Sequence, residues 1–221
     1  MNLRRRVAAE AIGTALLLAT VVGSGIMGER LAGGSVGLAL LANSIATGAV
    51  LVALILALAP VSGAHLNPLV TLTAAWNRSL PWAEVPAYVG AQLTGAIGGV
   101  VAANLMFELP AISLSAHART GAAQWLSEAI ATFGLLLVIE ACARLRDSTA
   151  VAFAVGGYIA AAYWFTASTS FANPAVTIAR ALSDTFAGIR PVDVPGFVAA
   201  QVVGASAAAA LVRWMLRAPA R

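Results

Sequence analysis

Residues 62 to 76 read SGAHLNPLVTLTAAW, and residues 169 to 182 read TSFANPAVTIARAL. Each places Asn-Pro before an apolar run of about ten residues, which spans roughly 15 Å as a helix. Asparagine is favoured at the N-cap and proline at the first helical position, so each Asn-Pro predicts a helix start. A helix of this length covers only half of a bilayer core of roughly 30 Å. The two predicted half-helices begin with Asn67, Pro68 and Leu69 and with Asn173, Pro174 and Ala175.

The composition of the whole chain predicts a membrane protein. Of its 221 residues, 60% are apolar and only 10% are charged, and the mean hydropathy is +0.88. A water-soluble domain of this length could not bury so much apolar surface. Six stretches have the roughly 20 mostly apolar residues of a membrane-spanning helix, at 7–27, 36–58, 86–107, 122–143, 149–167 and 194–216. We therefore expect an all-α membrane protein of six transmembrane helices and two re-entrant half-helices.

The distribution of arginine predicts the orientation. All 13 basic residues are arginines, and only Arg30, Arg119 and Arg190 fall in loops on one side, with Arg180 inside the second half-helix. The remaining nine fall at the other side, at positions 4, 5, 6, 78, 144, 146, 213, 217 and 221. The positive-inside rule then places both termini in the cytoplasm. The basic residues follow the membrane topology, and we expect no nucleic-acid partner. The basic and apolar N-terminus lacks the cleavage site of a signal peptide, so we expect the first span to be retained.

Three motifs recur in the same order in both halves of the chain. EAIGTALLL at 10 returns as EAIATFGLLLV at 128, NPLVT at 67 returns as NPAVT at 173, and AQLTG at 91 returns as AQVVG at 200. Three spans in each half force the second copy to start from the opposite side of the membrane. We expect a single channel domain over 1–221, with inverted repeats at approximately 1–110 and 120–221.

Inversion brings the two half-helices together near the middle of the membrane. Irregular backbone at that depth is tolerated only where it is buried in protein or lines a watery cavity, so the loops PVSGAHL and STSFA predict a pore or a binding site. The amides of Asn67 and Asn173 could donate to a passing oxygen, while two positive helix ends repel cations and protons. The alternative interpretation is that each asparagine is only a cap.

These features together resemble the aquaporin family, also called the major intrinsic proteins. The resemblance rests on the paired Asn-Pro half-helices, the SGAHLNP loop, and the repeated glutamate and AQxxG positions, and it covers nearly the whole chain. It implies a homotetramer in a bilayer, with a pore in each subunit that passes water or small uncharged solutes passively. It implies neither enzyme activity nor a cofactor.

The resemblance also assigns a selectivity filter. Counting family positions along this chain gives Thr47, Ala161, Ser170 and Val176. Most relatives carry arginine at the last position, so Val176 predicts a wider and nearly uncharged constriction. Arg180 lies one helical turn further on the same face. Two interpretations of Arg180 remain open: it guards the pore mouth, or it pairs with Asp184.

Polar residues inside the apolar spans have a structural interpretation. Glu10 and Glu128 are costly in a membrane, and the resemblance suggests that they accept hydrogen bonds from the re-entrant loops. Gln92 and Gln201 are interpreted as polar contacts between helices. His65 is expected to brace the loop before Asn67, and no metal site is expected.

The predicted filter favours small neutral solutes over water alone. The second half resembles bacterial aquaglyceroporin-like channels associated with arsenical detoxification, which points to the inner membrane of a bacterium. Glycerol-like polyols and neutral metalloid hydroxides, such as arsenite or methylated arsenicals, fit this interpretation. A strict water channel is the alternative. An inverted-repeat secondary transporter is also possible in principle, but the spans show no cluster of ionisable coupling residues. An intramembrane enzyme would need a nucleophile with its base, and the sequence shows none.

Overall fold

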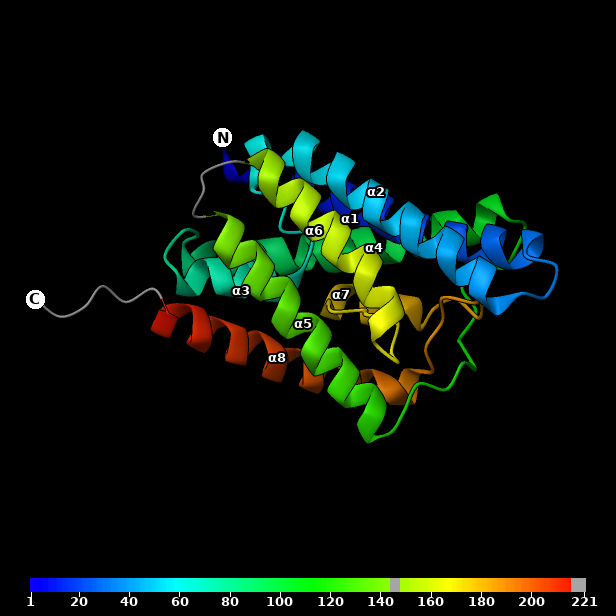
Figure 1. Cartoon of the computed structure of the whole chain (residues 1–221). Coiled ribbons are helices and arrows are strands. Elements are labelled where there is room, and N and C mark those ends of the chain that lie inside the picture. Colours follow the sequence, from blue (N-terminus) through cyan, green and yellow to red (C-terminus); the bar gives the residue numbers. More distant parts are fainter. Residues whose placement is uncertain (144–147, 216–221) are drawn as a thin grey trace, which may run out of the picture.

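The computed structural model describes residues 1–143 and 148–215, and this part of the chain is helical (Figure 1). Two short 3-10 turns, η1 (Trp82–Glu84) and η2 (Pro191–Asp193), precede α4 and α8. The α-helices are α1 (Leu3–Leu31), α2 (Val36–Ser62), α3 (Pro68–Trp76), α4 (Val85–Met106), α5 (Ala122–Ala143), α6 (Ser148–Phe165), α7 (Pro174–Arg180) and α8 (Val194–Met215). The predicted spans and both predicted half-helices, α3 and α7, are confirmed.

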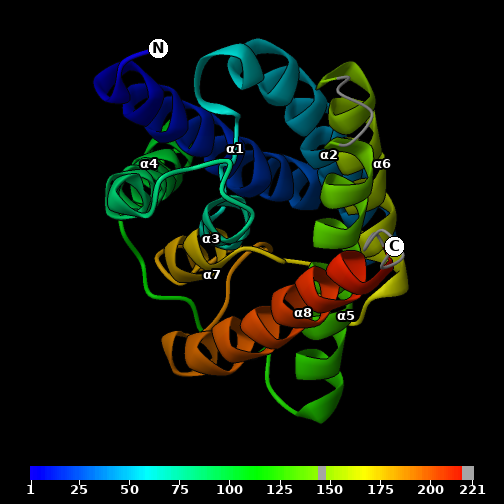
Figure 2. The same ribbon diagram turned by 90° about the vertical axis from the view of Figure 1, so that its left-hand side faces the viewer.

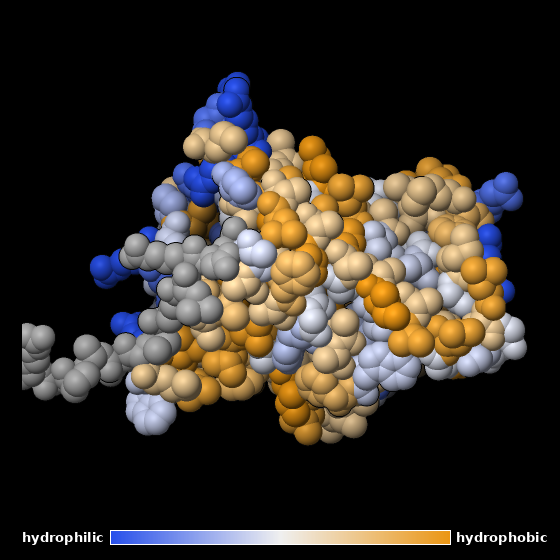
Figure 3. Space-filling model, turned by 45° about the horizontal axis from the view of Figure 1, so that its top comes forward, coloured by the Kyte–Doolittle hydropathy of each residue, from blue (hydrophilic) through white to orange (hydrophobic). Residues whose placement is uncertain are grey.

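The long helices have the length and surface of membrane spans. Within the described residues, five helical segments are long and apolar enough to cross a membrane, and a shorter apolar helix covers Thr149–Phe165. Many large apolar side chains on these helices are exposed, among them Ile12, Leu16, Phe153 and Val203. Figure 3 shows apolar surface between two ends that carry the hydrophilic patches. This surface would be unfavourable in water and suits contact with lipid.

The six long helices enclose the two short ones. Helix α1 packs against α2 and α4, α5 packs against α6 and α8, and α2 packs against α6. Figure 2 shows α3 and α7 in the middle of this ring. Gly95 and Gly99 of α4 face the backbone of α1 so closely that a Cβ would overlap it, and Gly204 of α8 meets α5 in the same way. Small residues thus allow the close helix contacts that membrane bundles use.

Helix α1 begins and helix α8 ends at the same end of the bundle. The start of α1 and the end of α8 are at the same end in Figure 1, which we call the terminal end; the opposite one is the far end. At the terminal end, the guanidinium of Arg6 pairs with Glu84 of η1 at 2.7 Å. Four arginines used in the orientation argument, Arg144, Arg146, Arg217 and Arg221, lie outside the described residues.

Candidate functional site

The two half-helices face each other through their capping asparagines. Asn67 Nδ2 donates to the carbonyl of Ala172, and Asn173 Nδ2 donates to the carbonyl of Leu66, both at 2.8 Å. Leu66 and Ala172 have left-handed backbones, with φ of 49° and 48°. Such conformations are costly for residues other than glycine and cluster at functional sites. Here they turn each carbonyl toward the opposite asparagine.

Each asparagine also caps its own helix. Asn67 Oδ1 accepts from Leu69 N at 2.9 Å, and Asn173 Oδ1 accepts from Ala175 N at 3.0 Å and Val176 N at 3.3 Å. A side-chain amide has two N–H groups, and the cross-link to the other loop uses one of them. The second N–H of each amide therefore remains available for a solute oxygen, next to two positive helix ends.

A buried carboxylate holds the first loop. Glu10 Oε1 accepts from Ser62 Oγ at 2.7 Å and from His65 N at 2.9 Å, while Oε2 accepts from Leu66 N at 2.7 Å and Gln92 Nε2 at 2.8 Å. Four donors thus satisfy an ion that would otherwise be very unfavourable inside a membrane protein. Glu10 is fully buried and contacts the loop behind Asn67, where no solute would meet it.

An equivalent set of contacts holds the second loop. Glu128 accepts from Phe171 N at 2.8 Å, Ala172 N at 2.9 Å and Gln201 Nε2 at 2.6 Å. Gln201 Nε2 also donates to Thr177 Oγ1 at 2.8 Å, and in the first half Gln92 donates to Thr71 at 2.9 Å. Sequence reasoning missed both threonines, although the repeated NPxVT pattern contains them.

His65 lies between its loop and the cavity. Its Nδ1 is 3.1 Å from Thr71 Oγ1, and its ring lies 5.3 Å from the ring of Tyr88. Together with the bond from His65 N to Glu10, these contacts fix the loop before Asn67. The side chain also forms part of the cavity wall.

A cavity of about 430 Å³ passes both asparagines. Its wall includes Ser79 and Glu140 toward the terminal end, and Tyr163 and Arg180 toward the far end. Most of the remaining wall is apolar, with residues such as Leu51, Ile55, Val70, Leu135, Val155 and Ile159. A cavity with an apolar wall and a few fixed polar groups suits a small neutral solute.

Three of the four residues assigned to the filter lie on the cavity wall, and the fourth assignment is wrong. Thr47, Ser170 and Val176 line the cavity, whereas Ala161 is exposed on the outside of α6. Tyr163 and Ile159 face the cavity instead, because residues four apart share a helix face and Ala161 lies between them. Tyr163 Oη is 3.2 Å from Thr47 Oγ1. The wall at this position therefore carries a bulky phenol in place of a small residue.

The expectation of a nearly uncharged filter is wrong, because Arg180 lies in the cavity wall. Its side chain is buried and belongs to the cavity wall. Its Nε donates to the carbonyl of Ala187, and its guanidinium carbon lies 3.4 Å from the centre of the Phe171 ring. Within the described residues, Arg180 forms no ion pair with Asp184, which accepts from Ala116 N at 2.9 Å. The interpretation of Arg180 as a partner of Asp184 is therefore wrong.

Comparison with known proteins identifies the family. The model of the family described as "Major intrinsic protein" matches residues 1–148 and 142–220. The chain is 56% identical to the aquaglyceroporin AqpS of Rhizobium meliloti (strain 1021), over 100% of this chain and 93% of that protein. It is 33% identical to the aquaporin NIP2-2 of Zea mays, over 85% of this chain and 65% of the maize protein.

The fold has a match among solved structures. The X-ray structure of the aquaglyceroporin from Plasmodium falciparum superposes with a TM-score of 0.74, at 22% identity, covering 96% of this chain and 95% of that one. At this identity the match shows the fold alone. Together with the facing half-helices and the family match over nearly the whole sequence, it shows that this multi-pass chain belongs to the major intrinsic protein family, whose members are membrane channels and not enzymes.

Proposed function

We propose that this protein conducts water and small uncharged solutes of the glycerol type passively, and that it excludes protons and ions. The observation that carries the proposal is the meeting of two helix N-termini at a pair of asparagines in the cavity wall. Two positive helix ends and the nearby Arg180 disfavour cations. The free amide N–H groups replace hydrogen bonds that a solute loses when it leaves bulk water. The similarity to a protein named an aquaglyceroporin supports solutes larger than water.

Neutral metalloid hydroxides are the finer part of the proposal. Arsenite and methylated arsenicals in their neutral forms carry hydroxyl groups, as glycerol does, and would accept hydrogen bonds from the same donors. The unpaired Ser170 Oγ and the cavity volume of about 430 Å³ support an oxygen-bearing solute of this size. The competing function is a strict water channel. The phenol of Tyr163 favours this alternative because a bulky side chain in the wall narrows the pore.

The proposal includes the topology and the assembly. Equivalent contacts of Glu10 and Glu128 with the two loops support inverted repeats within one channel domain. The arginine distribution supports cytoplasmic termini, with the far end outside the cell. The similarity to a protein of Rhizobium meliloti supports a bacterial inner membrane. We further propose a homotetramer, as the family resemblance implies, and mass determination in detergent or nanodiscs tests that assembly.

Stopped-flow swelling of proteoliposomes tests the function. We expect flux that rises linearly with the gradient for water, glycerol and arsenite, without dependence on a proton or sodium gradient. Saturable, gradient-dependent flux would instead indicate a transporter, and water flux alone would indicate a strict water channel. Recording from sealed bilayers should show no current at solute concentrations that give rapid swelling, and a solute-linked current would contradict ion exclusion.

A further inference from the structure

The loop between α4 and α5, residues 107–121, lies over the far end of α7. Its backbone joins the segment after that half-helix: Ser113 N donates to Leu182 O and Ser115 N donates to Ala181 O, each at 3.0 Å. These bonds connect the loop between the two halves to the second re-entrant segment. The loop is thus held beside the segment that follows the half-helix α7.

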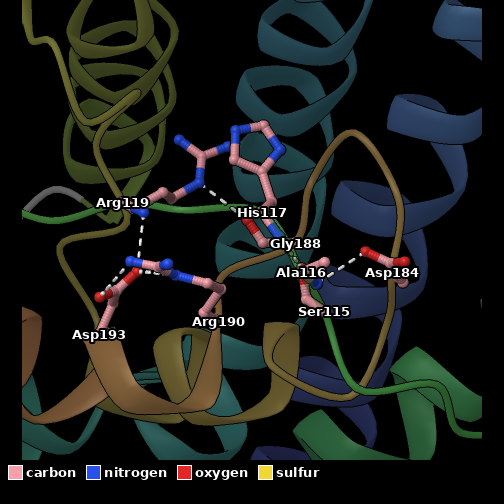
Figure 4. Close-up of polar contacts among 8 residues, drawn as sticks. All are labelled: Ser115, Ala116, His117, Arg119, Asp184, Gly188, Arg190 and Asp193. Atoms are coloured by element: carbon pink, nitrogen blue, oxygen red, sulfur yellow. Dashed lines mark hydrogen bonds and ion pairs between the residues drawn. The ribbon is translucent and has the colours of Figure 1, made fainter.

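Arg119 is the residue that this loop sends inward. Only 7% of it is exposed. Its Nε donates to Gly188 O at 2.8 Å, Nη2 to Phe186 O at 3.3 Å and Nη1 to Ser168 O at 3.2 Å. Its backbone N–H donates to Asp193 Oδ2 at 2.8 Å, as Figure 4 shows together with the bond to Gly188. Burial lowers the pKa of Arg119 to about 10, so its guanidinium remains charged at neutral pH.

Arg119 and Arg180 together bind three consecutive carbonyls. Arg119 takes those of Phe186 and Gly188, and Arg180 takes that of Ala187 between them. Both guanidinium carbons also lie near the ring of Phe171, at 5.1 Å for Arg119 and 3.4 Å for Arg180. Cation–π contacts and carbonyl oxygens thus hold two like charges near each other. We call these two arginines with residues 186–188 and Phe171 the arginine clamp.

The clamp determines which donors face the cavity. Within the described residues, Arg180 makes a hydrogen bond only through Nε. Its two terminal nitrogens have no hydrogen-bond partner there, and they are not fully enclosed by protein atoms. Since Arg180 lines the cavity, these nitrogens are open to it. Ser170 Oγ, in the same wall, is buried and has no partner among the described residues. A solute oxygen that reaches this end would therefore meet a guanidinium and a free hydroxyl.

We propose that Arg119 is a positioning residue that sets solute selectivity through the arginine clamp. It holds residues 186–188 and Phe171 in place, so that Arg180 presents its terminal nitrogens to neutral solutes bearing several oxygens. The proposal rests on the proposed function of the channel. Without Arg119, the carbonyls of Phe186 and Gly188 lose their donor, and buried groups without partners are unfavourable. The loop then relaxes, and the position of Arg180 is no longer fixed.

The first test compares two variants of Arg119 with a matched control. Arg119→Gln removes the charge, and Arg119→Lys keeps it but loses the planar fork. The control, Arg30→Gln, removes an exposed arginine that donates to Phe107 O at 2.9 Å, outside the clamp. Swelling rates for water, urea, glycerol and erythritol are measured per reconstituted protein. We expect Arg119→Gln to change the glycerol-to-water ratio by about threefold or more, Arg119→Lys to change it less, and Arg30→Gln to leave it unchanged. An unchanged ratio in both Arg119 variants overturns the proposal.

The second test asks whether Arg119 acts through Arg180. If it does, Arg119→Gln should have no further effect on the ratio once Arg180→Gln is present, and additive effects would overturn the mechanism. This readout is insensitive to a general loss of stability, which lowers the amount of reconstituted protein and leaves the ratio unchanged. If Arg119→Gln does not reconstitute, the same cycle with Arg119→Lys decides.

A third measurement keeps this proposal separate from the proposed function. If the wild type passes water alone, the solute proposal fails, and a reporter then tests the clamp. The single cysteine of the chain, Cys142, is replaced by serine, and Ser170→Cys in that background is modified by anionic or cationic methanethiosulfonates. Two buried cations should favour the anionic reagent. Arg119→Gln should reduce that preference while Arg30→Gln preserves it, and an equal preference in both variants overturns the clamp.

Discussion

At the residue scale, hydrogen-bond donors are concentrated at two levels of the cavity. Asn67 and Asn173 provide amide N–H groups at the meeting point of the half-helices, and Arg180 with Ser170 provides donors toward the far end. Apolar side chains line most of the remaining wall. A solute that fits the pore diameter can thus form hydrogen bonds mainly at these two levels. Pore width and lining donors together then determine which solutes pass.

Replacing Asn173 with aspartate should weaken the barrier to cations. Nδ2 of Asn173 donates to the carbonyl of Leu66, and an aspartate oxygen at that position would repel the carbonyl and place a negative charge between two positive helix ends. We expect a proton leak in proteoliposomes that contain a pH-sensitive dye. Asn2→Asp is the matched control, since Asn2 is an exposed cap of α1. Equal leaks in the two variants would contradict the expectation.

Replacing Val176 with arginine should reduce solute flux more than water flux. Val176 is buried in the cavity wall close to the caps of α7, so a guanidinium there would narrow the pore and add a second charge beside Arg180. We expect glycerol permeability to fall about tenfold, equivalent to roughly 1.4 kcal/mol of barrier, and water permeability to fall less. Val176→Leu adds bulk without charge and should have a smaller effect. Equal losses of water and glycerol would indicate general damage to the pore.

At the element scale, the two half-helices together cross the membrane. Carboxylates on two of the long membrane-spanning helices hold the loops before them in place. Glu10 lies on α1 and Glu128 on α5, and each accepts two backbone N–H groups from a re-entrant loop. Neither half-helix is long enough to be stable alone. Their position depends on the surrounding helices and on these buried bonds.

Glu128→Gln should therefore destabilise the protein. The three donors that now meet carboxylate oxygens are Phe171 N, Ala172 N and Gln201 Nε2, and an amide NH₂ would face at least one of them. We expect a loss of about 1–3 kcal/mol for the unsatisfied groups, measured as a lower melting temperature in detergent. The control, Glu84→Gln, breaks the partly exposed pair with Arg6 and should cost less than about 1 kcal/mol. Similar losses in both variants would mean that Glu128 does not hold the loop.

At the scale of the whole molecule, the far end is held together by contacts between the loop that links the two halves and the segment after α7. Loop 107–121 forms backbone hydrogen bonds with the segment after α7. The imidazole of His117, in this loop, lies close to the charged groups of the clamp (Figure 4). Partial burial, followed by the charges of Arg119 and Arg180, lowers the pKa of His117, while Asp184 raises it. The folded protein thus binds this proton less readily than the unfolded chain.

Acidification should loosen this end of the molecule. Because the pKa of His117 is lowered from its usual 6.5, its contribution to stability is complete above that value and is lost as the pH falls through the lowered pKa. We expect the melting temperature in detergent to decrease below pH 6.5, and His117→Gln to make that decrease shallower. An identical pH profile in wild type and variant would assign the dependence to another group.

Much of this architecture follows from the sequence alone. The spans are determined by long apolar runs, and the half-helices by Asn-Pro at the head of short ones, since both signals are local. The repeated NPxVT, glutamate and AQxxG motifs likewise indicate residues that meet the re-entrant loops. Each motif recurs because each half solves the same problem of holding irregular backbone inside a membrane.

The tertiary structure decided what faces the far end of the cavity. The family spacing of twelve residues before Asn173 assigned Ala161 to the filter. The path of the loop between α6 and α7 instead places Tyr163 on the cavity wall. The nearby charge Asp184 suggested a local partner for Arg180, yet its guanidinium turns to Phe171 and Ala187. Arg119 meets groups 49 to 74 residues away. No local pattern encodes such contacts, because they depend on where loops are placed by the packing of the six long helices.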